Sequence, residues 1–439
     1  MHSRSRAEWR ADQLTATFGS IDQRGGMRHP EGMDVTAEPL SLLRERTSMK
    51  WRTYPDDVLP LFVAEMDFPL AEPIARSLHD AINRSDTGYA PPINGMGEAF
   101  AGFAERRWGW QVDPAQVTST TDVSVAIVET IRRLITPGDG VVINPPIYPP
   151  FFELVREAGA TVIEVPLVHL PPEATNNTEA TDATGASAGW AIDLEALEQA
   201  FAAGARVYLL CNPHNPLGHP HSVQDLTAVA ELATRYNVTV ISDEVHAPLT
   251  HSDGAFTPYL SVSPETAETA ICITSASKAW NLAGLKCAVM VTASERMRAV
   301  IESLPMEVPW RMSQFGLIAG IAAFTEGEEW LDGVIASVEG NRHLLAELLD
   351  VQLPGVGFTQ PRASYLAWLD LGALGWGDDP SVVALERAKV AVIAGPDFGR
   401  EGRGFVRLNF GCAPDVLSEA ISRLAAAVSS HRSKPESAD

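Results

Sequence analysis

The sequence predicts an α/β protein in which a mostly parallel, mixed sheet is flanked by helices, with a smaller α+β domain beside it. Short apolar runs rich in β-branched residues alternate with amphipathic helical patterns, and after about residue 295 long amphipathic helices dominate. Strands that are apolar throughout and separated by helices indicate a parallel sheet that is covered on both faces.

The elements of the large sheet follow from these patterns. Strands are predicted at 141–144, 161–165, 206–211, 238–242, 271–274 and 287–292. Helices are predicted at 124–135, 194–203 and 223–236, where apolar residues recur at helical spacing. Asp193 and Ser222 precede the last two helices and are the residue types that cap helix N-termini.

The domain organisation is predicted from the same changes along the chain. We expect residues 81–294 to form the large domain, and residues 36–80 and 295–430 to form the small one, with strands at 366–369 and 405–410. Three segments without periodicity are predicted to be a loose N-terminal tail, a surface insertion and a C-terminal tail, at 1–35, 170–190 and 431–439.

The composition excludes several classes of protein. The 439 residues include 33 basic and 56 acidic side chains, a net charge of −23, which argues against nucleic acid and anionic membranes as partners. None of the four cysteines forms a C-x-x-C pair, so we expect free thiols and no metal site. The longest apolar stretch, 315–324, is about half the roughly 20 residues that a membrane span needs. With no apolar segment of a secretory signal at the N-terminus, a cytoplasmic protein is expected.

Ligands of open parallel sheets bind where the strands end, so the loops there are the first places to look for chemistry. The strand at 206–211 runs into N-P-H-N-P-L-G, whose prolines would hold Asn215 rigidly. Asp243 follows the next strand, where a carboxylate is costly unless it is paired. A rigid turn and a helix cap are the structural alternatives for these two residues.

A lysine follows the strand at 271–274. Burial between small and apolar neighbours would lower the pKa of the Lys278 amine, as a Schiff-base lysine requires, whereas a solvated lysine is the ordinary alternative. The segment 120–124 opens a helix and could seat a phosphate or serve only as a cap. Tyr148, between four prolines, could stack on a flat ligand or pack in the core. Arg407 could bind a carboxylate or form a surface salt bridge.

Four motifs together carry a resemblance. The segments N-P-H-N-P-L-G, S-D-E-V-H, S-A-S-K-A-W-N-L-A-G-L and F-V-R-L-N-F, in this order and spacing, resemble fold type I pyridoxal-phosphate enzymes of the class I/II aminotransferase superfamily, over roughly residues 36–430. The segments 59–68, 145–151 and 211–216, with His246 where typical aminotransferases carry tyrosine, resemble the C–S β-lyase branch of cystathionine β-lyases of the MalY/PatB type.

The resemblance implies pyridoxal 5'-phosphate as cofactor and an amino acid as substrate. Lys278 would form the Schiff base and move the Cα proton, and Asp243 would pair with the pyridine nitrogen. Arg407 would bind the substrate carboxylate, and Asn215 would also belong to the substrate site. The remaining implied cofactor contacts are Asn215 and His246 at the ring 3-oxygen, Tyr148 on the ring, Ser275, Ser277, Thr121, Asp122 and Val123 at the phosphate, and Tyr89 from a neighbouring subunit. The last of these implies a homodimer with shared active sites.

Two residues depart from the family pattern near the phosphate. Lys286 stands where arginine is frequent, which keeps the charge and loses the bidentate fork. Asp122 would bring a carboxylate close to a dianion. Either its side chain caps the helix and points away, or the phosphate-binding turn lies one residue from the position assigned to it.

The resemblance implies cleavage of cystathionine or related cysteine S-conjugates to a thiol, pyruvate and ammonia. Transamination of an L-amino acid would use the same residues and remains an alternative, as does a cofactor-bearing protein with a mainly regulatory binding role. A dinucleotide-binding oxidoreductase is disfavoured, because no G-x-G-x-x-G follows a strand in the region of the large domain.

Overall fold

The structure, a computed structural model, describes residues 33–91, 94–169 and 189–432, which belong to one compact unit, Met33–Asp439. Almost all of the predicted N-terminal tail, most of the predicted insertion at 170–190 and most of the predicted C-terminal tail lie outside these residues. Within them, no helix is long and apolar enough to cross a membrane. The predicted division into two domains stays a prediction.

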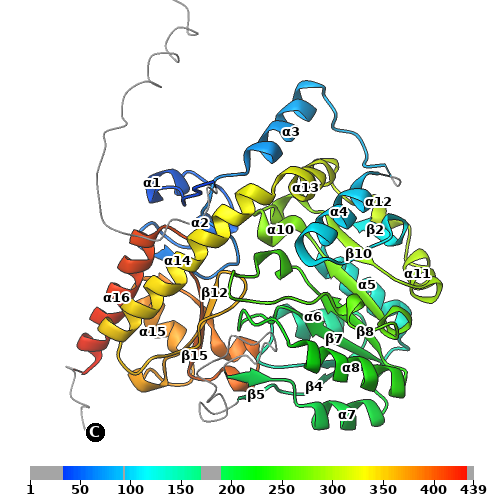
Figure 1. Cartoon of the computed structure of the whole chain (residues 1–439). Coiled ribbons are helices and arrows are strands. Elements are labelled where there is room, and N and C mark those ends of the chain that lie inside the picture. The colour runs from blue at the N-terminus through cyan, green and yellow to red at the C-terminus, as the bar shows by residue number, and fades with distance from the viewer. Residues whose placement is uncertain (1–32, 92–93, 170–188, 433–439) are drawn as a thin grey trace, which may run out of the picture. The chain divides into compact units, whose positions relative to one another are not determined.

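The largest sheet has seven strands in the order β2-β10-β9-β8-β7-β3-β4. Figure 1 shows this sheet in the right-hand part of the view, flanked by helices. Its strands are β2 (Val117–Thr120), β3 (Gly140–Ile143), β4 (Thr161–Glu164), β7 (Val207–Cys211), β8 (Thr239–Asp243), β9 (Ala270–Thr274) and β10 (Ala288–Val291). The five strands from β9 to β4 are parallel, whereas β10 is antiparallel to both of its neighbours. The predicted mixed, mostly parallel sheet is confirmed. The strand β2 was not predicted, because V-T-S-T is short, mostly half-buried and not an apolar run.

Helices cover both faces of this sheet, because alternate residues of each strand enter different apolar clusters. Ile241 packs in the cluster of α5 (Val123–Leu134), α6 (Pro150–Glu157) and α11 (Glu295–Glu302). Its neighbour Val240 packs in the cluster that contains the elements α4 (Met96–Trp108), α7 (Leu194–Ala202), α8 (Val223–Tyr236) and α13 (Gln314–Glu326). The predicted caps are confirmed: Asp193 accepts the N–H of Ala196, and Ser222 accepts the N–H of Asp225.

A second, antiparallel sheet has the order β11-β12-β15-β14. Its strands are β11 (Gly357–Phe358), β12 (Leu366–Asp370), β14 (Ile393–Ala394) and β15 (Phe405–Asn409). The helices α14 (Glu328–Gln352) and α16 (Pro414–Arg432) pack against each other beside it (Figure 1). The strands predicted at 366–369 and 405–410 are therefore confirmed.

The first described segment joins elements from the end of the chain. It contains α1 (Leu40–Leu43), α2 (Met49–Arg52) and β1 (Leu59–Pro60), and β1 pairs in parallel with β13 (Val390–Ala391). The other regular elements are α3 (Glu72–Asn83), β5 (Val168–His169), β6 (Trp190–Ala191), α9 (Thr266–Thr269), α10 (Ala276–Ala279), α12 (Glu307–Trp310) and α15 (Pro380–Glu386). This arrangement brings residues 61–68 beside the carboxyl ends of the large sheet's parallel strands, as their contacts below show.

Candidate active site

A cavity of about 180 Å³ lies at the carboxyl ends of β8 and β9. Predicted site residues that line it are Asp122, Val123, Tyr148, Asp243, Ser275, Ser277, Lys278 and Lys286. These side chains come from five separate segments of the chain, so the fold gathers them at the strand ends where a ligand was expected. Arg407 and His246 interact electrostatically with Lys278, and Asn215 is hydrogen-bonded to Arg407. Thr121 and Tyr89 are not in the cavity wall.

The Lys278 side chain lies on the short helix α10, directly after β9, and is half-buried. Its Nζ donates a hydrogen bond to the carbonyl oxygen of Ala64 at 3.1 Å. Burial lowers the pKa of the Lys278 amine to about 8, and the charge of Arg407 acts in the same direction, whereas Asp243 opposes it. The amine is therefore uncharged in a much larger fraction of molecules near neutral pH than an ordinary lysine.

Asp243 is the last residue of β8 and is buried. One of its carboxylate oxygens accepts the N–H of Val245 at 3.1 Å. Burial raises the pKa of Asp243 to about 7, although this hydrogen bond and the charge of Lys278 lower it. A carboxylate held this way, in the wall of a cavity, would be stabilised by a cationic or N–H-bearing ligand.

Arg407 extends from β15 and is buried rather than part of a surface salt bridge. Its Nη1 donates to Oδ1 of Asn215 at 3.1 Å, and its Nη2 donates to the carbonyl of Phe62 at 3.0 Å. Among the described residues, its buried Nε has no hydrogen-bond partner. Burial lowers the pKa of Arg407 to about 10. A guanidinium with neutral partners and an unused donor is well suited to bind a carboxylate.

His246 lies directly beyond the end of β8, and its Nδ1 is 3.0 Å from Oγ of Ser364. Burial lowers the pKa of His246 to about 3, and the charges of Lys278 and Arg407 lower it further. The imidazole is therefore neutral and can serve as a hydrogen-bonding group but carries no charge near neutral pH.

The carboxylate of Asp122, which departs from the family pattern, makes two contacts in the structure. One oxygen of Asp122 accepts the N–H of Val125 at 2.8 Å and so caps α5, which confirms the predicted cap. The other oxygen, however, lies 3.1 Å from Nζ of Lys286. The carboxylate therefore does not simply point away, because it pairs with the cation at the same end of the cavity.

The remaining predicted residues differ in how they are placed. Ser275 caps α10 by accepting the N–H of Ser277 at 3.0 Å, and its hydroxyl donates to the carbonyl of Cys287 at 2.6 Å. The hydroxyl of Thr121 instead donates to the carbonyl of Val308, at 3.1 Å. The Ser275 and Thr121 hydroxyls are thus engaged in hydrogen bonds within the chain.

Two predicted aromatic residues occupy contrasting environments. Tyr148 is half-buried in the cavity wall beside Phe151, and burial raises the pKa of its phenol. Tyr89 is 86% exposed and packs edge-on against Trp310. Of these two residues, Tyr148 is the one that can contact a ligand in the cavity of its own chain.

Three groups around Lys278 were not predicted from the sequence. The hydroxyl of the fully buried Tyr365 donates to the carbonyl of Ala64 at 3.0 Å, so this carbonyl serves both Tyr365 and Lys278. Asn409 donates to the carbonyls of Val63 and Glu65 at 2.7 Å each. Asn409 was detectable, because it is two residues from Arg407 in an alternating strand and so shares its face. A backbone carbonyl has no sequence signature.

The chain is similar to known proteins over most of its length. The sequence matches the family "Aminotransferase class I and II" over residues 56–424. It is 40% identical over 425 residues to a candidate cystathionine beta-lyase from Mycobacterium leprae, covering 91% of this chain and 100% of the relative. It is 35% identical to a cystathionine beta-lyase from Corynebacterium glutamicum, covering 91% and 99%.

The chain is also similar to solved structures. A candidate PLP-dependent beta-cystathionase from Corynebacterium diphtheriae superposes with a TM-score of 0.82 at 36% identity, covering 90% of this chain and 99% of that one. The family match covers residues 56–424, a range that includes the large sheet and Lys278. The chain belongs to the class I and II aminotransferase family.

Proposed function

We propose that the protein is a pyridoxal-phosphate-dependent C–S β-lyase, which cleaves cystathionine or related cysteine S-conjugates to a thiol, pyruvate and ammonia. The observation that carries this proposal is the pairing, in one cavity, of an amine of lowered pKa at Lys278 with a buried carboxylate at Asp243. Relatives that are 34% and 35% identical and bear the name cystathionine beta-lyase support the choice of reaction.

The residues present fit this cofactor. Lys278 supplies the amine that an aldehyde requires, and the buried Asp243 supplies the carboxylate that a protonated pyridine nitrogen requires. The N-terminus of α5 and Lys286 supply N–H donors and positive charge for a phosphate. Tyr148 forms a wall against which a flat ring can stack. When bound, pyridoxal phosphate supplies an electron sink for negative charge at the substrate Cα.

The chain's own residues then perform the remaining tasks. Arg407, held in place by Asn215 and the carbonyl of Phe62, binds the α-carboxylate of the amino acid. The neutral amine of Lys278 takes the proton from Cα, which its lowered pKa allows near neutral pH. The bond between Cβ and sulfur breaks, the sulfur leaves with its electron pair and gains a proton, and hydrolysis of the remaining fragment gives pyruvate and ammonia.

A second candidate, an aminotransferase of an L-amino acid, is favoured by one observation. The matched family is that of the aminotransferases, and more distant relatives at 24% and 25% identity bear aminotransferase names. Both reactions begin with loss of the Cα proton and use the same residues. They differ in whether the next step expels a group from Cβ or returns a proton elsewhere.

We also propose a homodimer in the cytoplasm. Tyr89 is exposed beside Trp310, itself half exposed at 48%, and such a pair of aromatic rings at the surface is suited to contact a second copy. In that dimer Tyr89 would reach the phosphate site of the partner. All four cysteines are free, as a reducing compartment favours.

Incubation of the cofactor-loaded protein with cystathionine tests the reaction. Release of pyruvate without an added keto acid is expected, and Lys278→Ala should abolish it. The same variant should lack the absorbance at about 420 nm that the wild type shows and that borohydride removes. Turnover that depends on a keto acid would instead identify an aminotransferase. Bound cofactor with no turnover of any amino acid would favour a regulatory binding role.

A further inference from the structure

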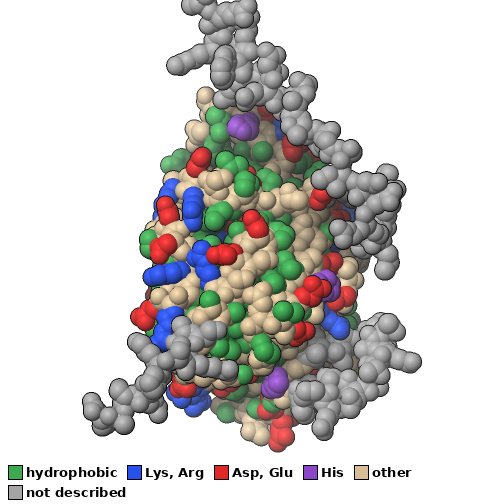
Figure 2. Space-filling model, turned by 90° about the vertical axis from the view of Figure 1, so that its left-hand side faces the viewer, with side chains coloured by type: hydrophobic (Ala, Val, Ile, Leu, Met, Phe, Trp, Pro, Cys, Tyr) green, Lys and Arg blue, Asp and Glu red, His purple; other side chains and the backbone are tan. Residues whose placement is uncertain are grey.

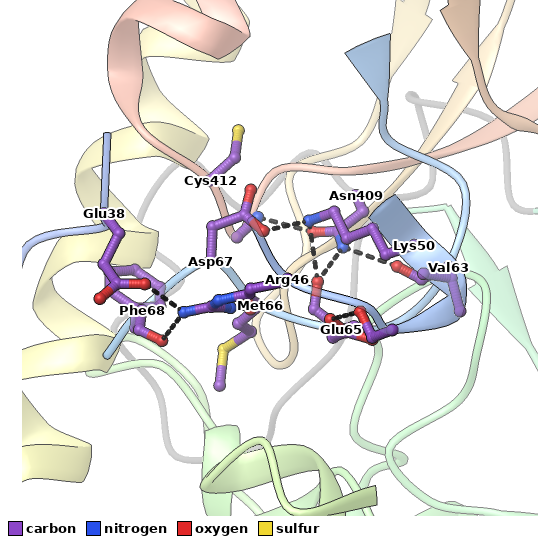
Figure 3. Close-up of polar contacts among 12 residues, drawn as sticks. Glu38, Arg46, Lys50, Val63, Glu65, Met66, Asp67, Phe68, Asn409 and Cys412 are labelled. Carbon is purple, nitrogen blue, oxygen red and sulfur yellow. Dashed lines mark hydrogen bonds and ion pairs between the residues drawn. The ribbon is translucent and has the colours of Figure 1, made fainter. Parts of the chain in front are cut away.

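The backbone around Ala64 is held by side chains on both sides. The carbonyls of its two neighbours, Val63 and Glu65, accept hydrogen bonds from Nδ2 of Asn409 at 2.7 Å each. The Glu65 carbonyl accepts a second one from Nζ of Lys50 at 3.0 Å. Figure 3 shows Lys50 and Asn409 converging on these carbonyls. The Ala64 carbonyl between them is the acceptor for the amine of Lys278.

Lys50 is itself held by a buried ion pair. Its Nζ lies 2.6 Å from Oδ1 of Asp67, and the two side chains are 0% and 1% exposed. Burial raises the pKa of Asp67, although the charges of Lys50 and then Arg46 lower it. The second carboxylate oxygen of Asp67 is buried and has no hydrogen-bond partner among the described residues. A pair desolvated this completely adds little stability over well-packed apolar side chains, so stabilisation alone is a weak explanation for it.

We propose that Lys50 and Asn409 are positioning residues for Lys278, that Asp67 orients Lys50, and that their common task is to fix the Ala64 carbonyl as the acceptor for the lysine amine. This proposal deepens the proposed function and rests on it, because it concerns the amine that reacts there. A fixed acceptor restricts rotation of Nζ and limits the directions in which its lone pair can point. It also stabilises the ammonium form relative to the neutral amine. Both forms can donate to the carbonyl, but the charged donor forms the stronger hydrogen bond.

Other charged groups near Lys278 must be kept constant in a test. Arg407 and Lys286 face it with positive charge, Asp243 and Glu65 face it with negative charge, and His246 faces it as a neutral ring. Replacing Lys50 and Asp67 together removes one charge of each sign and leaves the net charge unchanged. A change in the pKa of Lys278 in such a variant would therefore report the lost hydrogen bonds rather than a lost charge.

The experiment uses the full chain with Lys50→Met combined with Asp67→Leu. In protein stripped of cofactor, the pKa of Lys278 is measured from the pH dependence of its acetylation by acetic anhydride, followed by mass spectrometry. We expect this pKa to fall by about half a unit or more, because the ammonium loses a fixed acceptor. In the loaded enzyme, kcat for pyruvate release should fall about 10-fold with little change in KM, because the amine is misplaced and the substrate contacts remain.

A second variant covers the case in which the double variant does not fold. Asn409→Leu leaves the ion pair in place and removes both hydrogen bonds from the other side, so the same downward shift is expected. Arg46→Met is the matched control, since Arg46 binds carbonyls of the same segment at Met66 and Phe68, beyond the Ala64 region. It should leave the pKa of Lys278 unchanged.

The outcomes separate this proposal from the proposed function. If folded variants keep both the wild-type pKa of Lys278 and the wild-type kcat, the ion pair is only structural and the proposal is wrong. If the wild-type enzyme releases no pyruvate, the proposed function fails, but the acetylation measurement still decides whether Lys50 and Asn409 position the amine.

Discussion

Asp122 and Lys286 are 164 positions apart in the sequence, and Oδ2 of the first lies 3.1 Å from Nζ of the second at one end of the cavity. The other oxygen of Asp122 caps α5. One carboxylate thus stabilises a helix and neutralises a lysine at the place where a phosphate would need both the helix N-terminus and the positive charge.

Asp122→Asn should tighten cofactor binding. Asparagine caps helices as well as aspartate does, so the stability of α5 is retained while the negative charge is removed and Lys286 is released. We expect the Kd for pyridoxal phosphate to fall by about 3- to 10-fold, and the effect to weaken at high salt. Fluorescence titration of the stripped protein measures the Kd. A weaker complex would mean instead that Asp122 is needed to hold Lys286 in place.

Arg407→Lys should raise KM for the amino-acid substrate by about 10-fold or more, because lysine cannot form the bidentate contact and cannot reach both Asn215 and the Phe62 carbonyl. The kcat should change less than KM. Steady-state kinetics with cystathionine provide the measurement, and an amine that lacks the α-carboxylate is the control substrate, for which the two enzymes should differ little. Equal loss with both substrates would contradict the assigned role.

Reassembly of the stripped protein with pyridoxal phosphate should depend on pH through Lys278. Burial lowers its pKa to about 8 from an ordinary 10.5, so the rate of reassembly should rise with pH and level off above about 8. Between about pH 8 and pH 10.5 the Lys278 amine is therefore protonated in the unfolded chain but mostly neutral in the folded protein. Stability of the stripped protein should accordingly increase with pH across that window. A rate that continues to rise up to about pH 10 would show an unperturbed amine.

Asp243→Asn should stabilise the stripped protein and inactivate the loaded one. The pKa of Asp243 is raised to about 7 from 3.8, so the folded protein loses stability as pH rises between these values, and asparagine removes this loss. At about pH 8 we expect a gain of about 1–2 kcal/mol in the free energy of unfolding, measured by urea denaturation. At about pH 4 the variant and the wild type should be similar. Pyruvate release should fall by about 100-fold or more.

Much of the fold was predictable because the signals are local. Continuous apolar runs identified the strands of the parallel sheet, and Asp193 and Ser222 identified helix starts that the structure confirms. The direction of β10 was not predictable, since a strand's own sequence does not state whether its neighbours run parallel or antiparallel. The short strand β2 was missed because its half-buried residues alternate too briefly to form a pattern.

The candidate site was predictable to a similar degree. Side chains at strand ends, such as Asp243 and Lys278, meet because parallel strands end at one edge of the sheet. The contact between Arg407 and Asn215 joins residues 192 positions apart, and no local pattern specifies it. The ion pair of Lys50 and Asp67 was invisible for the same reason, since either residue alone reads as a solvated charge.

The hydrogen bond from Lys278 to Ala64 also bears on how the protein is made. During synthesis, the residues around position 64 leave the ribosome 214 residues before the lysine that they will hold. These residues, together with Lys50 and Asp67, cannot reach their final contacts until the strands of the large sheet and then β15 have emerged. A nascent chain halted before β15 would expose these groups to water and to chaperones. Reactivity of the amine would thus be among the last properties that the growing polypeptide acquires.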